Sequence, residues 1–287
     1  MTVTDPVASP PANRAGAPPT AGLGRRAWRT FWTLRDPISP RLRWSLMLFS
    51  AIAPLAVWAI VGGSGVVDPT FLPSPAAVLR AGGELWSTGA LQQDLAATLT
   101  RIGIGFGLIV LVSVPLGLAI GSFASIRALF EPVIGLLRYM PAPAFIPLLI
   151  IWLGLGENSK IALLFIGTVF FNTLMTADAA ALVPRELIDT SYTLGASRWK
   201  VMRKVVFPHS TPGIIDAMRV NIAATWNLVV VAELLAAQSG LGYRITRAQR
   251  GLHTDQIFFV LIVIGVIGLA TDLGFRGLRN LIAPWAK

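Results

Sequence analysis

The stretch Asp189-Thr-Ser-Tyr-Thr-Leu-Gly195, followed after nine residues by Val205-Val-Phe-Pro208, lies between two long apolar runs. Gly195 readily takes a positive φ, so it is expected to end one short helix. Ser197 is placed to cap a second helical piece, and Pro208 is expected to stop it. Two helical pieces in a membrane loop favour a docking element for another subunit. An amphipathic helix lying on the lipid surface explains the same pattern.

Composition places the chain in a membrane. Apolar residues make up 54% of the chain and charged residues 13%, with a mean hydropathy of +0.66, whereas soluble domains carry about 25% charged residues. The sequence has no cysteine and only two histidines, so we expect no disulfide, no thiolate chemistry and no metal site. The net charge of +10 would suggest nucleic acid as the partner of a soluble protein. Here much of that charge lies in loops, where it sets membrane orientation, and we expect no nucleic-acid partner.

Long apolar runs predict an all-α, polytopic membrane protein with about six transmembrane helices, since each needs about 20 apolar residues. Such runs lie near residues 44–63, 101–121, 129–154, 160–182, 212–236 and 257–278, and the third is broken by prolines. An amphipathic piece outside the membrane is expected at 76–86. Residues 1–40 are rich in Pro, Ala and Gly and are expected to form a disordered basic cytoplasmic arm. Residues 41–287 then form the membrane domain.

Lysine and arginine set the expected orientation. Seven arginines precede the first apolar run, which places the N-terminus in the cytoplasm. Six spans then return the loop 183–211 and the C-terminus to the cytoplasm. The loop 237–256 should lie outside, yet it carries Arg244, Arg247 and Arg250.

That arginine cluster has two interpretations. Residues three apart form one stripe on a helix, and guanidinium suits sulfonate, nitrate or carboxylate groups. Arg244, Arg247 and Arg250 would then form an outer basic lip that attracts an anion or an acidic patch on a delivery protein. The alternative is a solvated face paired with lipid headgroups and Asp255.

Polar residues inside the apolar runs mark a candidate substrate path, because charge is costly to bury in lipid. Arg219, Trp226 and Glu233 are seven residues apart and share one helix face, with Asn227 beside it. This face is expected to meet the helix bundle or a water-filled path. A structural network, for example Arg219 paired with Asp216, satisfies the same energetics.

Arg138 and Pro141 belong to the same candidate path. They stand at the proline break of the third apolar run. A broken helix exposes backbone groups that are tolerated only when they are buried in protein or line a cavity.

Signals of an enzyme are missing from the sequence. It has no phosphate-cradling Gly-Lys-Ser/Thr loop, so the chain is not expected to hydrolyse ATP itself. No His, Asp and Ser constellation can be placed at one membrane depth, and we expect no catalytic residue.

The loop at 183–208 resembles the coupling loop of binding-protein-dependent ABC importer permeases. In that family the pattern is Glu-Ala-Ala, three residues, Gly, nine residues and then Ile-x-Leu-Pro. In this chain the spacing from Gly195 to Pro208 matches the pattern. Asp189-Thr-Ser191 stands where the family has Glu-Ala-Ala. Further segments resemble the nitrate, sulfonate and taurine type of these permeases: Phe71-Leu-Pro-Ser-Pro75, Thr98-Leu-Thr-Arg101 with Gly105-Phe106, and Ser239-Gly-Leu-Gly-Tyr243. The residues to which the resemblance gives an ATPase-coupling role are Asp189, Thr190, Ser191, Gly195, Val205, Phe207 and Pro208.

This resemblance implies the type I importer architecture in the bacterial inner membrane. The implied partners are two ATPase subunits docked on the loop 183–208, a solute-binding protein outside, and a second permease, most simply a copy of this chain. No cofactor is expected in this chain, because the ATPase subunits bind the ATP. The implied cargo is a small anion such as nitrate, an alkanesulfonate, taurine or bicarbonate. The alternatives are an organic nutrient (a thiamine-pyrimidine precursor or an aromatic acid) and a polytopic membrane enzyme or scaffold.

Overall fold

The computed structural model describes residues 38–285, apart from the side chains of residues 235 and 236. All regular structure in these residues is helical, as predicted. In chain order the elements are α2 (Pro40–Gly63), α3 (Pro75–Ser87), α4 (Ala90–Ser122), α5 (Ala124–Leu137), the 3-10 turn η1 (Ala142–Phe145), α6 (Ile146–Leu153), α7 (Glu157–Ala181), α8 (Arg185–Thr193), α9 (Arg198–Val201), the π-helical turn η2 (Met202–Val206), α10 (Phe207–Ala236), α11 (Leu241–Arg250) and α12 (Thr254–Ile282). Almost all of the predicted N-terminal arm lies outside the described residues.

The chain divides into two units, residues 1–58 and 59–287, each of which is described by itself. In the first unit the described chain is the larger part of α2, an apolar helix of 24 residues. Its length is sufficient to cross a membrane, which agrees with the first predicted span.

Five helices among residues 38–285 are long and apolar enough to span a membrane, and a bent pair makes a sixth. The bent pair is α5 with the segment 142–153, and its two parts meet at 83°. The predicted break of the third span is therefore confirmed. α3 confirms the amphipathic piece, but α4 starts at Ala90, well before the predicted start of the second span at 101.

α4 and α7 pack closely because glycines face α7 along α4. A Cβ on Gly117 would lie 2.5 Å from the carbonyl oxygen of Thr173 and 2.6 Å from Cβ of Thr176. One turn further, a Cβ on Gly121 would collide with the backbone of Ala177. This spacing of small residues lets two membrane helices approach at backbone distance.

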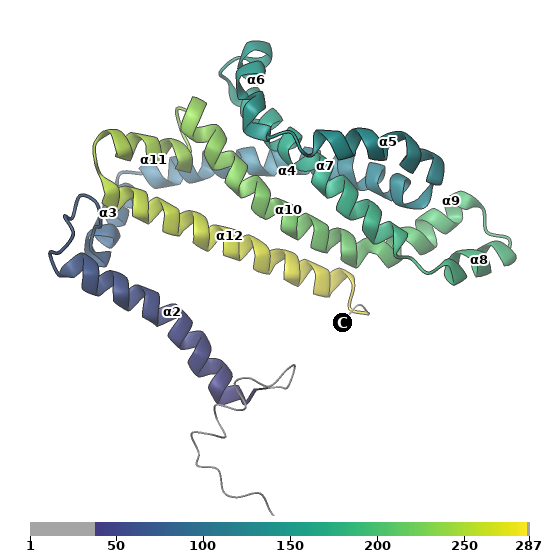
Figure 1. Cartoon of the computed structure of the whole chain (residues 1–287), viewed down its shortest axis with the longest axis horizontal. Helices are drawn as coiled ribbons and strands as arrows, with labels where there is room; N and C mark the ends of the chain where they lie inside the picture. Colours follow the sequence, from purple (N-terminus) through teal and green to yellow (C-terminus); the bar gives the residue numbers. More distant parts are fainter. Residues whose placement is uncertain (1–37, 286–287) are drawn as a thin grey trace, which may run out of the picture. The chain divides into compact units, whose positions relative to one another are not determined.

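α10 packs on the other side of α7 and also along α12 (Figure 1). The largest hydrophobic cluster fills the space between α4, α10, α11 and α12, and its buried members include Phe106, Ile109, Trp226, Val229 and Val260. Buried apolar side chains of this kind are the main favourable contribution to helix packing against the bundle interior.

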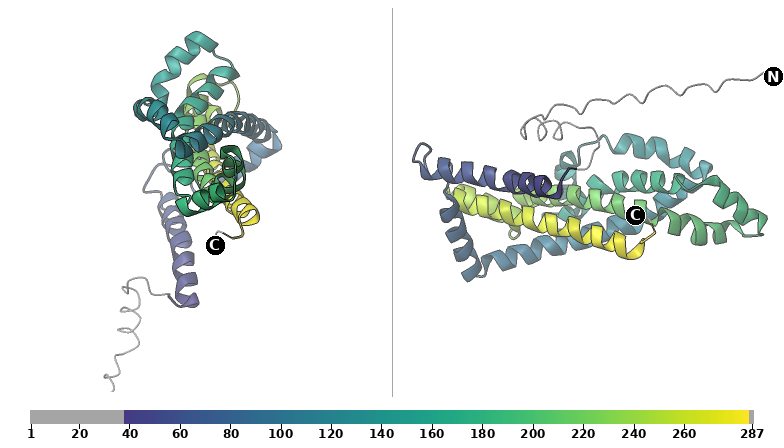
Figure 2. Two further views of the ribbon diagram at one scale, coloured as in Figure 1. Left: turned by 90° about the vertical axis from the view of Figure 1, so that its right-hand side faces the viewer. Right: turned by 90° about the horizontal axis from the view of Figure 1, so that it is seen from below.

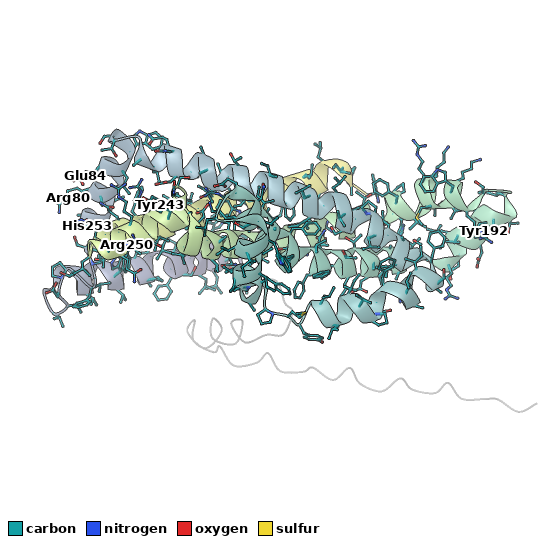
Figure 3. All side chains as sticks on the ribbon, turned by 90° about the horizontal axis from the view of Figure 1, so that it is seen from above. Arg80, Glu84, Tyr192, Tyr243, Arg250 and His253 are labelled. Atoms are coloured by element: carbon teal, nitrogen blue, oxygen red, sulfur yellow. The ribbon has the colours of Figure 1, made fainter. Side chains whose placement is uncertain are left out.

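The bundle has two distinct ends. The short helices α8 and α9 form one end and α11 forms the other, as both Figure 1 and the views in Figure 2 show. Figure 3 places Tyr192 of α8 at one end, and Tyr243 and Arg250 at the opposite end. We call these the coupling-loop end and the α11 end.

Candidate functional site

The loop between α7 and α10 folds as two short helices joined at a tight turn, as predicted. Gly195 follows α8 with a φ of 77°, a conformation that favours glycine. The N–H of Ala196 donates to the carbonyl of Ser191 at 3.0 Å, which closes the end of α8 in a Schellman arrangement. Ser197 caps α9 by accepting a hydrogen bond from the N–H of Lys200. The relative orientation of the two helices therefore depends on Gly195.

Pro208 does not stop the second helix, and that prediction was wrong. α9, η2 and α10 together form one continuous span, Arg198–Leu234, and Pro208 lies in the first turn of α10. The π-helical turn η2 precedes Pro208 and winds more widely than an α-helix. This extra width accommodates the proline ring, which would otherwise clash with the preceding turn.

The residues to which the resemblance gives a coupling role lie on or beside this loop. Asp189, Thr190 and Gly195 are exposed, while Ser191, Val205 and Pro208 are half-buried. Phe207 is 45% exposed at the start of α10. The exposed positions leave the loop accessible to another protein.

At the α11 end, polar side chains from four helices meet in what we call the ion-pair cluster, made of Asp94, Thr98, Arg101, Glu157, Lys160, Glu233 and Arg244. Arg101 of α4 lies at its centre with 3% of its side chain exposed. Its guanidinium forms a bidentate pair with Glu157 of α7. Nη1 also donates to Glu233 of α10 at 2.7 Å, and Ser239 accepts two more hydrogen bonds. All five N–H groups of Arg101 are thus satisfied, which a buried guanidinium requires.

Glu233 is completely buried, and its carboxylate organises the loop between α10 and α11. Its Oε1 accepts from the hydroxyl of Thr98 at 2.8 Å, and its Oε2 accepts from the N–H of Gly242 at 2.8 Å. The Thr98 hydroxyl in turn accepts the N–H of Leu241 at 2.9 Å. In this conformation the carboxylate faces the bundle and is engaged in structural hydrogen bonds.

Arg244 belongs to the ion-pair cluster and neither to an outer basic lip nor to a solvated face, which corrects both interpretations of the arginine stripe at this residue. Its Nε donates to Asp94 at 2.6 Å, so its partner is on α4 and is not Asp255. Only 8% of Arg244 is exposed, whereas Arg247 and Arg250 are both exposed. Each helical residue turns by about 100°, so a spacing of three residues drifts around the helix and lets the first arginine point inward.

Two glycines allow the α10–α11 loop to approach the ion-pair cluster. Gly240 has a φ of 119°, and a Cβ there would lie 2.6 Å from Nη1 of Arg101. A Cβ on Gly242 would lie 2.7 Å from the carbonyl of Val230. The segment Ser239-Gly-Leu-Gly-Tyr243 thus has glycine at positions 240 and 242, where a larger residue would displace the groups that form the buried ion pairs.

The charges of the ion-pair cluster balance, with three carboxylates facing two guanidiniums and one ammonium. Within residues 38–285, no group of three or more histidine, aspartate or glutamate side chains is placed to hold a metal ion. The cluster is therefore a set of mutually compensated charges, which is the condition for keeping ionised groups in a bundle interior.

Sequence reasoning missed Asp94, Glu157 and Lys160, and it quoted Thr98 and Arg101 only as part of a resemblance. A signal was present, because Asp94, Thr98 and Arg101 are spaced by four and three residues and share one helix face. A polar face at that spacing, next to an apolar run, indicates a partner inside the bundle.

Three predicted path residues, Arg138, Pro141 and Asn227, line one cavity of about 370 Å³ between the bend after α5, α7 and α10. Nη2 of Arg138 donates to the hydroxyl of Tyr139 at 3.0 Å, and the guanidinium lies 4.9 Å from that ring's centre. Nε of Arg138 is buried without a hydrogen-bond partner among the described residues. The side chain of Asn227 is exposed and donates to the carbonyl of Ala223. The described residues that line the cavity include no carboxylate.

The other predicted path residues lie away from this cavity. Trp226 is buried in the largest hydrophobic cluster. Arg219 pairs with Asp272 of α12 and not with Asp216, which instead pairs with Arg279 at 3.3 Å. α12 packs alongside α10 and brings its own charged residues to both partners, so the expected pairing within α10 does not form.

Comparisons with known proteins agree with this geometry. The family described as "Binding-protein-dependent transport system inner membrane component" matches residues 113–287. The taurine transport system permease protein TauC of Escherichia coli (strain K12) is 35% identical over 257 residues, covering 88% of this chain and 92% of that protein. The putative aliphatic sulfonates transport permease protein SsuC of Bacillus subtilis (strain 168) is 31% identical, covering 88% and 91%.

Solved structures agree in fold. In an inward-facing structure of the MetNI methionine ABC transporter, one chain aligns with a TM-score of 0.61 at 18% identity, covering 69% of this chain and 98% of that chain. The chain thus shares its fold with this solved structure over about two thirds of its length. With its six predicted spans, its two-helix loop and relatives that align over most of its length, this chain belongs to the family of inner-membrane permease subunits of binding-protein-dependent ABC importers.

Proposed function

We propose that this permease imports a small oxyanion of the alkanesulfonate class, delivered by a solute-binding protein and driven by partner ATPase subunits. The observation that carries the choice of substrate is the cavity that Arg138 and Asn227 line. The names of the relatives TauC and SsuC support the same class. Nitrate and bicarbonate are also small oxyanions and remain the alternatives to an alkanesulfonate.

The lining of the cavity suits an oxyanion. Arg138 brings its guanidinium to the wall of the cavity, and one of its five N–H groups donates to the hydroxyl of Tyr139. No Asp or Glu lines the cavity to compete for this guanidinium. A guanidinium fork matches sulfonate and carboxylate oxygens better than an ammonium does. One guanidinium and one carboxamide make a weak site, and transport requires binding that is weak enough for the solute to leave.

The cavity also supports pairing with a second permease, which we propose is a second copy of this chain. Arg138 and Asn227 are polar residues of membrane spans, and the face that carries them would be costly to leave in lipid. A second copy covering this face would enclose a path lined by both sets of residues. Glu233, Trp226 and Arg219 would support that path from within the bundle and not touch the solute in this conformation.

The coupling-loop end is the proposed docking site of the ATPase subunits. The exposed residues Asp189 and Thr190 would contact the ATPase, and Gly195 would hold the two loop helices at their angle. ATP would be bound and hydrolysed by the ATPase subunits, with no cofactor in this chain. Both chain termini would lie in the cytoplasm, and the exposed Arg247 and Arg250 would face the solute-binding protein as a reduced outer lip.

ATP-driven uptake of taurine by the full transporter in proteoliposomes tests the substrate. Arg138→Gln should lower uptake about tenfold, the effect of losing one charge-assisted hydrogen bond, and Arg138→Lys should recover only part of it. Arg80→Gln, on the exposed face of α3, is the matched control. Unchanged uptake in Arg138→Gln would contradict the anion site. Uptake of a neutral pyrimidine in place of taurine would favour an organic nutrient as the cargo.

A further inference from the structure

A second cavity lies at the coupling-loop end, beside the proposed ATPase docking site, and it shares no lining residue with the cavity of Arg138. Its volume is about 450 Å³. It is bounded by the α4–α5 turn, the end of α7, α8 and α9. It therefore lies between the coupling loop and the turn that joins two membrane spans.

Three arginines line this cavity: Arg127 of α5, Arg185 of α8 and Arg198 of α9. The described residues that line it include no aspartate or glutamate, although Glu186 and Asp189 follow the lining residues Arg185 and Ile188 on α8. None of the three arginines forms an ion pair within residues 38–285. Arg185 and Arg198 are exposed and Arg127 is half-buried. Three guanidiniums that line one cavity make its potential positive, which favours an anion there.

Arg127 has most of its donors available toward the cavity. It is half-buried, and its Nε donates to the carbonyl of Ile120 at 3.4 Å. That bond uses one of five N–H groups, which leaves the terminal nitrogens for a ligand. The hydroxyl-bearing residues Ser122 and Tyr192 also line the cavity and add polar groups.

The backbone around the cavity includes two helix N-termini and also the last turns of α4 and α7. α5 starts at the cavity and receives no side-chain cap at Phe123. α8 also starts there, and Pro184 provides no side-chain cap. Uncapped helix N-termini carry positive partial charge and unpaired N–H groups. The C-terminal carbonyls of α4 and α7 and the first-turn residue Glu186 of α8 offset them, so the main positive charge at the cavity comes from the three arginines.

We propose that this cavity binds a tetrahedral oxyanion of the phosphate type. A tetrahedral anion presents several oxygens at once, so it can accept hydrogen bonds from guanidiniums on α5, α8 and α9 together. The same chemistry is supplied by a free phosphate or by the phosphate of an anionic lipid headgroup. A bound anion would link the coupling loop to the α4–α5 turn. Anion binding to the cavity would therefore regulate the position of the loop.

The test uses the full chain purified with its ATPase subunits in nanodiscs of phosphatidylcholine. Potassium phosphate is titrated against potassium chloride at equal ionic strength while thermal denaturation is followed. A saturable stabilisation by phosphate alone is expected if the site takes the free anion. Arg127→Gln should raise the apparent Kd about tenfold, as one lost charge-assisted contact implies. Lys200→Gln, on the same surface but outside the cavity lining, should respond like the parent chain.

A second arm identifies a lipid as the source. If phosphate has no effect, native mass spectrometry in nanodiscs containing phosphatidylglycerol should show retained anionic lipid on the parent complex and less on Arg127→Gln. Failure of both arms overturns the proposal. It is also overturned if Arg127→Gln loses the ATPase subunits while its anion response is unchanged, since the arginines would then serve an acidic segment of a protein partner. Taurine uptake through the Arg138 cavity is a separate readout, so failure here leaves the import function unaffected.

Discussion

Arg101 of α4 and Glu233 of α10 form a 2.7 Å ion pair in which neither side chain is more than 3% exposed. The two residues are 132 positions apart in the chain, so the pair forms only when the bundle closes. The same carboxylate also holds the N–H of Gly242. One buried contact therefore joins two membrane spans to the loop that leads into α11.

Removing one member of this pair should destabilise the bundle strongly. Arg101→Ala leaves Glu233 as a buried carboxylate without a counter-charge, and breaking a buried pair in this way costs about 3–5 kcal/mol. Thermal denaturation followed by fluorescence-detected size exclusion should show a large loss of stability. Arg247→Ala, on the exposed side of α11, should stay near the parent, at about 0.5 kcal/mol or less. Equal stability of the two variants would contradict the assignment.

Gly240→Ala should destabilise more than Gly65→Ala, although both glycines have positive φ. Gly65, at φ 72°, has open space around it, so alanine there meets only backbone strain of about 1 kcal/mol. At Gly240 the added Cβ would also displace Arg101 and Glu233. The same denaturation assay compares the stability of the two variants. A similar loss of stability in both would show that the close contact of Gly240 with Arg101 and Glu233 does not contribute.

Gly195→Val should impair coupling while the protein still inserts into the membrane. A β-branched residue at φ 77° is strained, at a cost of about 1 kcal/mol or more, and the turn would shift α9 relative to α8. ATP-driven uptake and co-purification of the ATPase subunits are the measurements. Gly195→Asn should do better, because asparagine tolerates the left-handed region. Normal uptake and ATPase retention in Gly195→Val would argue against a coupling role.

Neutralising Arg247 and Arg250 together should weaken uptake a few-fold at low salt. Two exposed charges at a solvated rim together contribute about 1 kcal/mol by Coulomb attraction, which is a few-fold effect, and they are screened by salt. The deficit should shrink as ionic strength rises, which uptake assays at two salt concentrations would show. An equal deficit at both concentrations would point to a structural effect and away from an electrostatic lip.

The orientation predicts where fused reporters function. A reporter after Lys287 should behave as cytoplasmic, and one inserted near Gly89, between α3 and α4, should behave as external. The reverse pattern would mean that the arginines of α11 determine the topology.

Much of the fold could be predicted from apolar periodicity and from Gly and Pro residues. The apolar runs predicted the membrane spans, Gly195 predicted the turn in the coupling loop, and Pro141 predicted the bend after α5. The error at Pro208 arose because a proline is tolerated in the first turn of a helix, and no pattern in the sequence signals the π-helical turn before it.

The candidate site was less readable, because its contacts join distant parts of the chain. The sequence indicates that Glu233 lies on a face inside the bundle, but only the packing of α4 supplies Arg101 as its partner. The sequence interpretation placed Arg244 outside, whereas the same packing pairs it with Asp94. Asp216 was considered as the ion-pair partner of Arg219 because the two residues are close in sequence. In the structure Arg219 pairs with Asp272, because α12 packs against α10. The spacing of polar residues along one helix identifies its polar face. It does not show which other helix packs against that face.

One continuous helix, which includes the π-helical turn η2, runs from the coupling loop toward the α11 end. The continuous helix Arg198–Leu234 has 37 residues, a length of about 55 Å at about 1.5 Å per residue. A π turn contains one residue more than the α turn it replaces. Deleting one residue from 202–206 would therefore let this segment close as an ordinary α turn, and Glu233 would still face Arg101. Deleting one residue from the α-helical part of α10 before Glu233 would instead rotate Glu233 by about 100° and shift it by about 1.5 Å, away from Arg101.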